Sequence, residues 1–372
     1  MGKSVWEVLV MKKWQVREVD ISFVIPVYNG EKCIEECVNS ILTWNWKQEI
    51  EILVIDDGST DGTAGLCRKM EEKDKRIMLF SIANSGQSIA RNYGMRRCGG
   101  RYICFADADD TINAKEVSHM WEIAEREEAD VVMGAYFRVN GAKRERIHLA
   151  GEGIIARKGT PEEKKLYRRV RAESAFGYVW NKLYRKEFLD KHKLRMDDIR
   201  KIYMEDQLFN LKVWSKNPVW YCCDRPVYYY DTKNVSTTRK SEPEIHTKNI
   251  ALIDELTAYY EENGNLQENL DVLLPLIMRS FCWSLVKNIA YEGKGMAKIK
   301  ERAEAYMCSE NVRKVIGMRG AVRKLWGLPS ALQAAFYSVC LVLIRWRWSG
   351  CVSIIFYFTY PVMKKYILKV VK

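Results

Sequence analysis

Residues 21–56, ISFVIPVYNGEKCIEECVNSILTWNWKQEIEILVID, contain two patterns of a buried strand with one pattern of a helix between them. The runs Ile21–Val27 and Glu51–Asp56 are short, largely apolar and rich in β-branched residues, as expected of strands that are covered on both faces. Apolar side chains between these runs fall on one helical face, at Ile34, Val38, Ile41 and Leu42. This stretch therefore predicts a strand–helix–strand unit of an α/β sheet.

The same alternation continues to about residue 140. Three further apolar runs, IMLFSI (77–82), YICFAD (102–107) and VVMGAYF (131–137), are separated by helical patterns. Strands that alternate with helices predict a parallel sheet, whose ligands bind at the carboxyl ends of the strands. Counted from Ile21, the second and the fourth of the five apolar runs lead into acidic residues. We therefore predict a functional site at the carboxyl edge of the sheet.

The acidic cluster in ICFADADDT (103–111) needs a positive partner. Asp107, Asp109 and Asp110 directly follow apolar residues, and like charges this close repel each other. The partner could be a metal ion, a basic side chain or the N-terminus of the next helix. One Asp would suffice to cap a helix, whereas paired carboxylates suit Mg²⁺, which also binds water and phosphates. The residues favour a metal site.

The segment IDDGSTDGT (55–63) has two interpretations. An acid after the second strand could accept hydrogen bonds from a ribose or a base. Asp, Gly, Ser and Thr also favour turns and helix caps, and the segment alone favours that interpretation. The chain has neither G-x-G-x-x-G after its first strand nor a P-loop, so a dinucleotide-binding Rossmann site and a Walker site are not supported.

The chain has 372 residues and a net charge of +12, and the excess charge is concentrated at one end. Residues 311–372 contain eleven Lys or Arg and no Asp or Glu, together with many aromatic residues. A basic and aromatic tail suggests an anionic membrane surface as a partner rather than nucleic acid.

The cysteines and the N-terminus predict a cytoplasmic protein. None of the eleven cysteines forms a C-x-x-C pair, so we expect reduced and mostly buried thiols rather than a metal site. The apolar stretch near the N-terminus is too short and too polar for a signal peptide.

Six motifs occur in an order and spacing that resemble inverting glycosyltransferases of family 2, which have the GT-A fold. They are VIPVYNG (24–30), VIDDGSTDGT (54–63), NSGQSIARNYG (84–94), YICFADADD (102–110), VWNKLYR (179–185) and EDQLF (205–209). The chain looks most like bacterial enzymes that build capsular, exopolysaccharide or wall polymers. The resemblance covers residues 20 to about 240.

This resemblance implies a site for a nucleotide-sugar, most simply a UDP-sugar. Pro26 and Tyr28 would line the base pocket, and Asp57 would accept a hydrogen bond from uracil N3. The other implied contacts to the donor are Asn84, Gly86, Arg91, Asp107, Ala108 and Trp180. Asp109 would bind Mg²⁺ or Mn²⁺, and the metal would neutralise charge on the leaving diphosphate.

The resemblance also implies that Asp206 is the general base. It would take the proton of the acceptor hydroxyl while that oxygen attacks the anomeric carbon, so that one displacement inverts the configuration. Without the other motifs, Glu205 and Asp206 would be read as acids that complement a helix dipole. The chain departs from the family after YYY, where Asp231 replaces an expected basic residue. Lys233 and Ser236 are the remaining candidates for contacts with the diphosphate.

Two other functions compete for these residues. D-x-D-x-T after an apolar strand also fits phosphotransferases that resemble haloacid dehalogenases, with Asp107 as nucleophile and Asp109 as acid/base. That family places its motif on the first strand, and IDDGSTDGT would then be unexplained. A catalytically inactive scaffold on a membrane surface is the second alternative, which the intact carboxylates disfavour.

The expected organisation is a short N-terminal extension (1–19) followed by a catalytic domain (20–240). Within that domain, residues 20–140 would bind the donor and 173–240 the acceptor, joined by a charged connection. Residues 241–326 are predicted to be helical, and 327–372 to form helices that associate with a membrane.

The tail contains two apolar stretches, Ala331–Ile344 and Cys351–Met363, each shorter than the ~20 residues that cross a bilayer. Cations flank both stretches, including Arg345 and Arg347 between them. A translocated loop would be poor in Lys and Arg, so we predict two amphipathic or re-entrant helices in the cytoplasmic leaflet. The alternative is a buried helical hairpin of a soluble domain, which the excess of cations disfavours. An enzyme held at the cytoplasmic side of the membrane could reach a saccharide or lipid-linked acceptor.

Overall fold

We describe a computed structural model of the chain that covers residues 18–149, 153–156, 174–232, 243–292, 295–328 and 330–370. Contacts divide the chain into two compact units, and each is described by itself. Unit 1 holds the described parts of Met1–Gly153, Trp180–Lys193 and Val219–Asp231, and unit 2 those of Ile154–Val179, Leu194–Pro218 and Thr232–Lys372. All but the last two residues of the predicted N-terminal extension lie outside the described residues.

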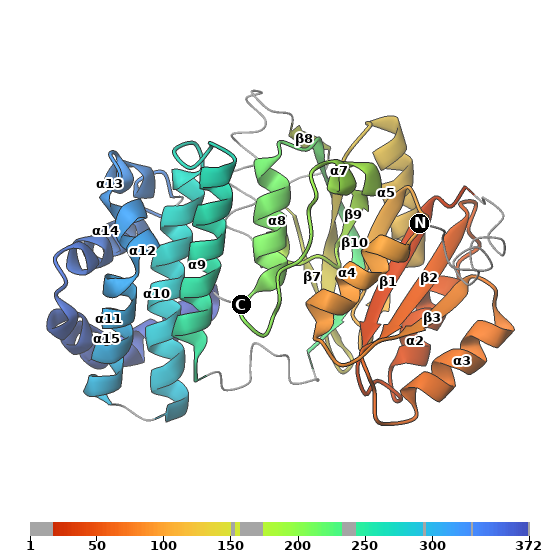
Figure 1. Cartoon of the computed structure of the whole chain (residues 1–372), viewed down its shortest axis with the longest axis horizontal. Helices are drawn as coiled ribbons and strands as arrows, with labels where there is room; N and C mark the ends of the chain where they lie inside the picture. The colour runs from red at the N-terminus through yellow and green to blue at the C-terminus, as the bar shows by residue number, and fades with distance from the viewer. Residues whose placement is uncertain are drawn as a thin grey trace, which may run out of the picture. The chain divides into compact units, whose positions relative to one another are not determined.

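Unit 1 is built on a twisted mixed sheet (Figure 1). Its strands are β1 (Ile21–Val27), β2 (Ile50–Asp56), β3 (Ile77–Ser81), β4 (Tyr102–Phe105), β5 (Thr111–Ile112), β6 (Val131–Asn140), β7 (Lys143–Ile147), β9 (Lys182–Arg185) and β10 (Trp220–Asp231). They are ordered β3-β2-β1-β4-β9-β6-β10-β5, and β7 pairs with β6. The five strands predicted from apolar runs are confirmed as β1, β2, β3, β4 and β6.

The prediction of a parallel sheet is correct for only part of it. Strands β3, β2, β1 and β4 are parallel neighbours, and β6 is parallel to β10. The prediction is wrong for strand β9, which lies between β4 and β6 and is antiparallel to both. The motif VWNKLYR that carries β9 follows no crossover helix from β6 in the described residues, so its direction was not encoded in the strand–helix alternation.

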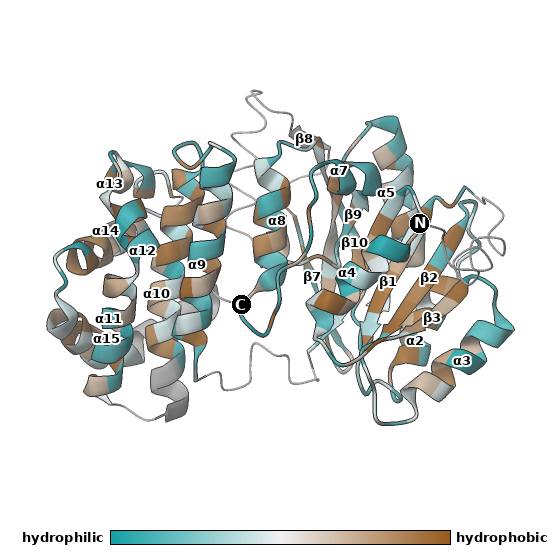
Figure 2. Cartoon of the chain, viewed as in Figure 1, coloured by the Kyte–Doolittle hydropathy of each residue, from teal (hydrophilic) through white to brown (hydrophobic). Residues whose placement is uncertain are grey.

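Helices of unit 1 cover a core made by the first strands. They are α2 (Ile34–Leu42), α3 (Thr63–Lys73), α4 (Gln87–Arg97), α5 (Ala114–Arg126) and α7 (Lys186–Lys191). Every residue of β1 and β2 is buried, and Figure 2 shows hydrophobic residues concentrated along these strands. The predicted inner face of α2 is confirmed at Ile34, Val38 and Ile41, with Cys37 added to it. All eleven cysteines are free thiols, and eight of them are buried.

The charged segment predicted as a connection begins as a strand. Lys143–Ile147 forms β7, which extends β6 as an antiparallel hairpin with mostly exposed side chains. The alternation of Lys, Arg and Glu there pairs Arg138 with Glu145 across the hairpin. Residues 157–173 lie outside the described part of the chain.

Unit 2 is mainly helical, as predicted for residues 241–326. Its elements are β8 (Ile154–Ala156), η1 (Ser174–Phe176), α8 (Glu205–Ser215), α9 (Ile245–Glu262), α10 (Leu270–Glu292), α11 (Met296–Cys308), α12 (Glu310–Gly317), α13 (Ala321–Leu325), α14 (Ala331–Arg345) and α15 (Ser349–Val370). Helices α9, α10 and α11 pack side by side (Figure 1). Leu256, Leu285 and Tyr306 are among their fully buried residues. The two tail helices are confirmed as α14 and α15, and no described helix is long and apolar enough to span a membrane.

Gly94 fixes how closely α4 approaches β1. A Cβ atom added at Gly94 would lie 2.4 Å from Cγ1 of Val24, a distance that real Cβ atoms do not adopt. Helix α4 carries the motif NSGQSIARNYG at its start, so this close packing places the motif against the sheet.

We predict that Gly94→Ala lowers the free energy of unfolding by about 1–3 kcal/mol, because the added methyl overpacks the contact with Val24. Gly65→Ala in α3 is the matched control, since nothing lies within 4 Å of its added Cβ. The control should be neutral or stabilise by up to about 1 kcal/mol through helix propensity. Urea unfolding of both variants measures the difference, and equal midpoints would contradict the packing argument.

Candidate active site

The carboxyl ends of β1, β2 and β4 meet at one edge of unit 1. Val27 pairs with Asp56 in the parallel register, and the N–H of Asp57 donates to the carbonyl of Val27 at 2.8 Å. On the other side of β1, the N–H of Ala106 donates to the carbonyl of Val24 at 3.1 Å. The two acidic clusters therefore follow the strands on either side of β1, at the carboxyl edge where they were predicted.

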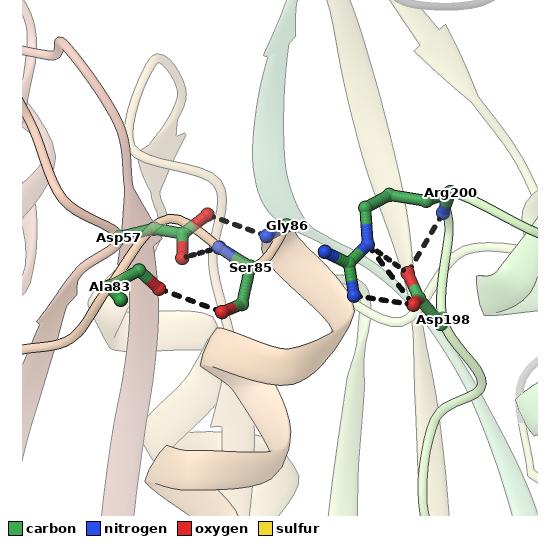
Figure 3. A network of polar contacts seen from close by, with 6 residues as sticks. All are labelled: Asp57, Ala83, Ser85, Gly86, Asp198 and Arg200. Atoms are coloured by element: carbon green, nitrogen blue, oxygen red, sulfur yellow. Dashed lines mark hydrogen bonds and ion pairs between the residues drawn. The ribbon is translucent and has the colours of Figure 1, made fainter.

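Asp57 joins this edge to the start of α4. Its two carboxylate oxygens accept the N–H groups of Ser85 and Gly86, at 2.7 and 2.8 Å (Figure 3). Gly86 is the N-cap residue of α4 and has φ of +89°, which favours glycine. A buried carboxylate thus satisfies backbone donors at a helix N-terminus, a role that sequence reasoning had not given Asp57. Each oxygen keeps a further lone pair for a ligand donor.

Asp56 and Gly58 shape the loop after β2. One oxygen of Asp56 accepts the N–H of Ser59 at 3.0 Å, and the other accepts the hydroxyl of Ser81 at 3.3 Å. Gly58 has φ of +74°, and an added Cβ would lie 2.8 Å from the backbone nitrogen of Asn84. The turn interpretation of IDDGSTDGT is therefore confirmed for Asp56, while contact of Asp57 with a ribose or base stays a prediction.

Arg91 supplies a positive partner for the acidic cluster. Its side chain is 1% exposed, and Nη2 lies 2.6 Å from Oδ1 of Asp107. The backbone N–H of Asp107 donates to the hydroxyl oxygen of Tyr228 on β10 at 2.9 Å. Of the three partners considered for this cluster, a basic side chain is present, and it holds Asp107.

Asp110 is the buried member of the cluster. Burial, together with the nearby charge of Asp107, raises the pKa of Asp110 to about 9. One oxygen of Asp110 accepts the N–H of Asp231 at 2.7 Å, which ties the cluster to the end of β10. Asp110 does not cap the next helix, because the N-cap residue of α5 is Asn113. A carboxyl group with so high a pKa is protonated at neutral pH, which removes one of the three repelling charges.

Asp109 is the exposed member, and Ala108 beside it is half-buried. With Asp107 paired to Arg91 and Asp110 protonated, Asp109 presents a carboxylate to solvent. A carboxylate of this kind fits Mg²⁺ or Mn²⁺, which needs one or two protein carboxylates and takes the rest from water and substrate phosphates. Among the described residues, no group of three or more His, Cys, Asp or Glu could hold a metal ion by itself.

The remaining donor residues of unit 1 differ in exposure. Tyr28 and Asn84 are exposed, whereas Pro26 is buried in β1, where it pairs with Ile55. Trp180 is 3% exposed and stacks on Tyr228, with ring centroids 4.3 Å apart, and on Tyr230 at 5.7 Å. Trp180 therefore packs within an aromatic stack, and contact with a sugar stays a prediction. Lys233 and Ser236 lie outside the described residues.

Asp206 belongs to unit 2, in the first turn of α8. Met204 precedes the helix with φ of 64°, which is uncommon for a residue other than glycine. Glu205 is buried, while Asp206 is half-buried. Backbone strain of this kind often accompanies functional residues.

Side chains on both sides of Asp206 fasten the start of α8. Asn210 Nδ2 lies 3.0 Å from the carbonyl oxygen of Asp206 and 3.1 Å from those of Gly177 and Tyr178. On α10, Arg279 donates to Gln207 at 2.7 Å, and the buried Lys287 donates to Tyr203 at 3.2 Å.

These partners were missed by sequence reasoning, because only the fold brings α10 against α8. Of these partners, only Asn210 could have been predicted from the sequence, because it lies four residues after Asp206 in the same helix. Unit 2 also holds the ion pair of Asp198 with Arg200, at 2.7 Å (Figure 3).

Comparison with known proteins gives a family match for the first half of the chain. Residues 22–193 match the family described as glycosyl transferase family 2. The uncharacterized glycosyltransferase EpsJ of Bacillus subtilis is 28% identical over 71% of this chain and 78% of its own length. A poly(ribitol-phosphate) beta-glucosyltransferase of Bacillus spizizenii is 24% identical over 76% of this chain and 43% of its own length.

Solved structures support the same fold. The S. aureus protein TarS, residues 1–349 in complex with UDP-GlcNAc, has a TM-score of 0.67 at 19% identity and covers 88% of this chain and 92% of its own. The fold is therefore GT-A-like, and these matches do not favour the phosphotransferase alternative. The part of the chain that matches glycosyltransferase family 2 is residues 22–193, and the chain is a glycosyltransferase.

Proposed function

We propose that the chain transfers a sugar from a UDP-sugar to a hydroxyl of a saccharide or lipid-linked acceptor in the synthesis of a bacterial surface polysaccharide. The observation that carries the proposal is the arrangement at the carboxyl edge of unit 1. There Asp57 anchors the loop before α4, and Arg91 holds Asp107 beside the exposed Asp109. Relatives of this chain include a poly(ribitol-phosphate) glucosyltransferase, which supports a wall or capsule polymer as product.

The donor is assigned to unit 1. Structures of TarS in complex with UDP-GlcNAc and with UDP support a uridine nucleotide as the donor group. Tyr28 is exposed beside Pro26 and is available to stack on a base, and Asp57 retains lone pairs for the N–H of uracil. Asn84 and Gly86, in the loop that Asp57 orders, would lie along the nucleotide.

Asp109 would hold a divalent metal, Mg²⁺ or Mn²⁺, together with the diphosphate of the donor. Such an ion, when bound, supplies Lewis-acid neutralisation of the charge on the leaving nucleoside diphosphate. Arg91 contributes by fixing Asp107, so that the carboxylate oxygens at this edge are oriented before the donor arrives.

Asp206 would act as the general base. It accepts the proton from the acceptor hydroxyl as the oxygen bonds to the anomeric carbon, and the bond to the nucleoside diphosphate breaks on the opposite face. The anomeric configuration is inverted because a single displacement takes place. Asn210, Arg279 and Lys287 keep the first turn of α8 in place while the base works.

A panel of UDP-sugars, assayed for UDP release with and without a saccharide acceptor, tests the proposal as a whole. Release of UDP from one sugar, raised by acceptor, would support it and identify the donor sugar. No release from any UDP-sugar with either metal would refute a uridine donor.

We predict that Asp109→Asn lowers the metal-dependent part of UDP affinity by at least ~10-fold, because an amide is a poor ligand for a hard cation. Calorimetry with UDP, with and without Mn²⁺, measures this part directly. Asp190→Asn is the matched control, since Asp190 lies on α7 and pairs with Lys186. Unchanged affinity in Asp109→Asn would show that the metal assignment is wrong.

We predict that Asp206→Asn keeps the affinity for UDP but loses at least ~10²-fold in kcat, the contribution of one positioned base. Initial rates of transfer, combined with calorimetry on the same preparation, separate chemistry from binding. A loss of UDP affinity and kcat by equal factors would point instead to a structural role for this carboxylate.

A further inference from the structure

Helix α14 is apolar on both of its faces. Its inner face is buried, with Ala334, Tyr337, Cys340, Leu341 and Ile344. Its outer face exposes apolar residues at helical spacing, of which Leu332 is 75% exposed, Val339 53% and Val342 41%. A helix of a water-soluble surface would carry polar residues on that outer face, so the outer face of α14 is unusual.

Helix α15 repeats the pattern. Its inner face packs on unit 2, where Phe356 contacts Phe281 and Ser349 hydrogen-bonds to Glu304. On the outer face, Ile354 is 51% exposed and Phe358 is 71% exposed, one helical turn apart. Phe336 of α14 contacts Phe356, which joins the two helices.

The turn between the helices adds aromatic residues and cations. Trp346 and Trp348 are both more than half exposed, and Arg345 and Arg347 are exposed beside them. Arg347 has φ of +56°, so the turn is tight. Two Trp alternating with two Arg is the composition found where a protein meets lipid headgroups.

We call the tail face the set formed by these exposed side chains on α14, α15 and their turn. It consists of Leu332, Val339, Val342, Trp346, Trp348, Ile354 and Phe358. Exposed apolar side chains gathered on two packed helices and their turn mark a contact with a partner or a membrane.

Polar side chains in the two helices are already satisfied. Ser338 donates to the carbonyl of Ala334 at 2.8 Å, and Thr359 donates to that of Ile355 at 2.6 Å. Ser353 donates to the carbonyl of Gly350 at 2.8 Å, and Gln333 donates to the hydroxyl of Tyr337 at 3.3 Å. Groups satisfied within the helix need no water, so they tolerate an apolar medium.

Cations around the tail face lack acidic partners. Arg319, Arg323 and Lys324 precede it and are exposed, as are Arg345 and Arg347. None of these five forms an ion pair with a carboxylate among the described residues. Residues 311–372 contain no Asp or Glu, so an acidic partner for this segment has to come from elsewhere in the chain, as Glu261 does for Lys314.

We propose that the tail face lies on an anionic lipid bilayer, with Trp346 and Trp348 at the level of the headgroups. Apolar side chains flanked by uncompensated cations match a surface that is apolar inside and negatively charged outside. A second copy of the chain would bring like charges together at this face, which argues against self-association. The proposal concerns attachment and is independent of the proposed chemistry.

The test is sedimentation of the full chain with vesicles. Vesicles of phosphatidylcholine alone are compared with vesicles of phosphatidylcholine and phosphatidylglycerol in equal parts, at low and high salt. We expect binding to the anionic vesicles that weakens with salt, because cations near a charged surface are screened.

Two double variants separate charge from apolar contact. Arg345→Glu with Arg347→Glu should lower partitioning onto anionic vesicles by at least ~10-fold, since each cation contributes about fivefold. Trp346→Ser with Trp348→Ser should lower partitioning at both salt concentrations, because the apolar contact is not screened.

Matched controls carry the same changes elsewhere. Arg68→Glu with Lys69→Glu places the same charge change on exposed positions of α3, and Trp44→Ser removes an exposed indole from unit 1. Both control variants should bind to the anionic vesicles as strongly as the unchanged chain does. Equal loss in Arg68→Glu with Lys69→Glu would show a nonspecific charge effect and overturn the assignment to the tail face.

Two further results would also overturn it. Failure of the full chain to sediment with anionic vesicles at low salt refutes lipid binding. A dimer by sedimentation velocity that Trp346→Ser with Trp348→Ser converts to a monomer, without any vesicle binding, would assign the face to a second copy.

Discussion

Repulsion among three carboxylates at the end of β4 is the constraint on which the site of unit 1 depends. The structure relieves this repulsion in a different way for each of the three carboxyl groups. Arg91 pairs with Asp107 from within α4, and burial keeps Asp110 protonated where it accepts the N–H of Asp231. Asp109 alone remains an exposed carboxylate. One strand end thereby carries a paired acid, a neutral acid and an exposed carboxylate.

This solution requires α4 to sit close to the sheet, because Arg91 reaches Asp107 from inside the core. Gly94 allows that approach against Val24, and Asp57 fixes the start of the helix through Ser85 and Gly86. The acid after β2 and the acid after β4 thus act on the two ends of one segment. Asp57 holds its first backbone donors, and Asp107 holds a guanidinium one turn further along. Three of the motifs that resemble family 2 enzymes, VIDDGSTDGT, NSGQSIARNYG and YICFADADD, are therefore parts of one connected arrangement.

Much of unit 1 could be predicted from the sequence. Apolar runs bounded by helical patterns located β1, β2, β3, β4 and β6, because strands buried on both faces leave a continuous signal. The direction of β9 could not be predicted, since it depends on which neighbour the returning chain meets. The positive partner of Asp107 was open at that stage, because Arg91 lies sixteen residues away and reaches the cluster only after α4 has packed. Around Asp206, the cations of α10 are distant in sequence and left no pattern to find.

Strand β9 has a consequence for how the protein forms during synthesis. It pairs with β4 on one side and β6 on the other, and in sequence it comes more than forty residues after β6 ends. Until Trp180–Arg185 leaves the ribosome, the free edge of β4 is a row of unpaired backbone groups next to a finished parallel sheet. Strand β10 then closes the other side of β6 only when residue 231 has been made. Nascent chains of intermediate length therefore pass through a stage in which an exposed strand edge invites pairing with other chains, and chaperone binding during that stage would protect them.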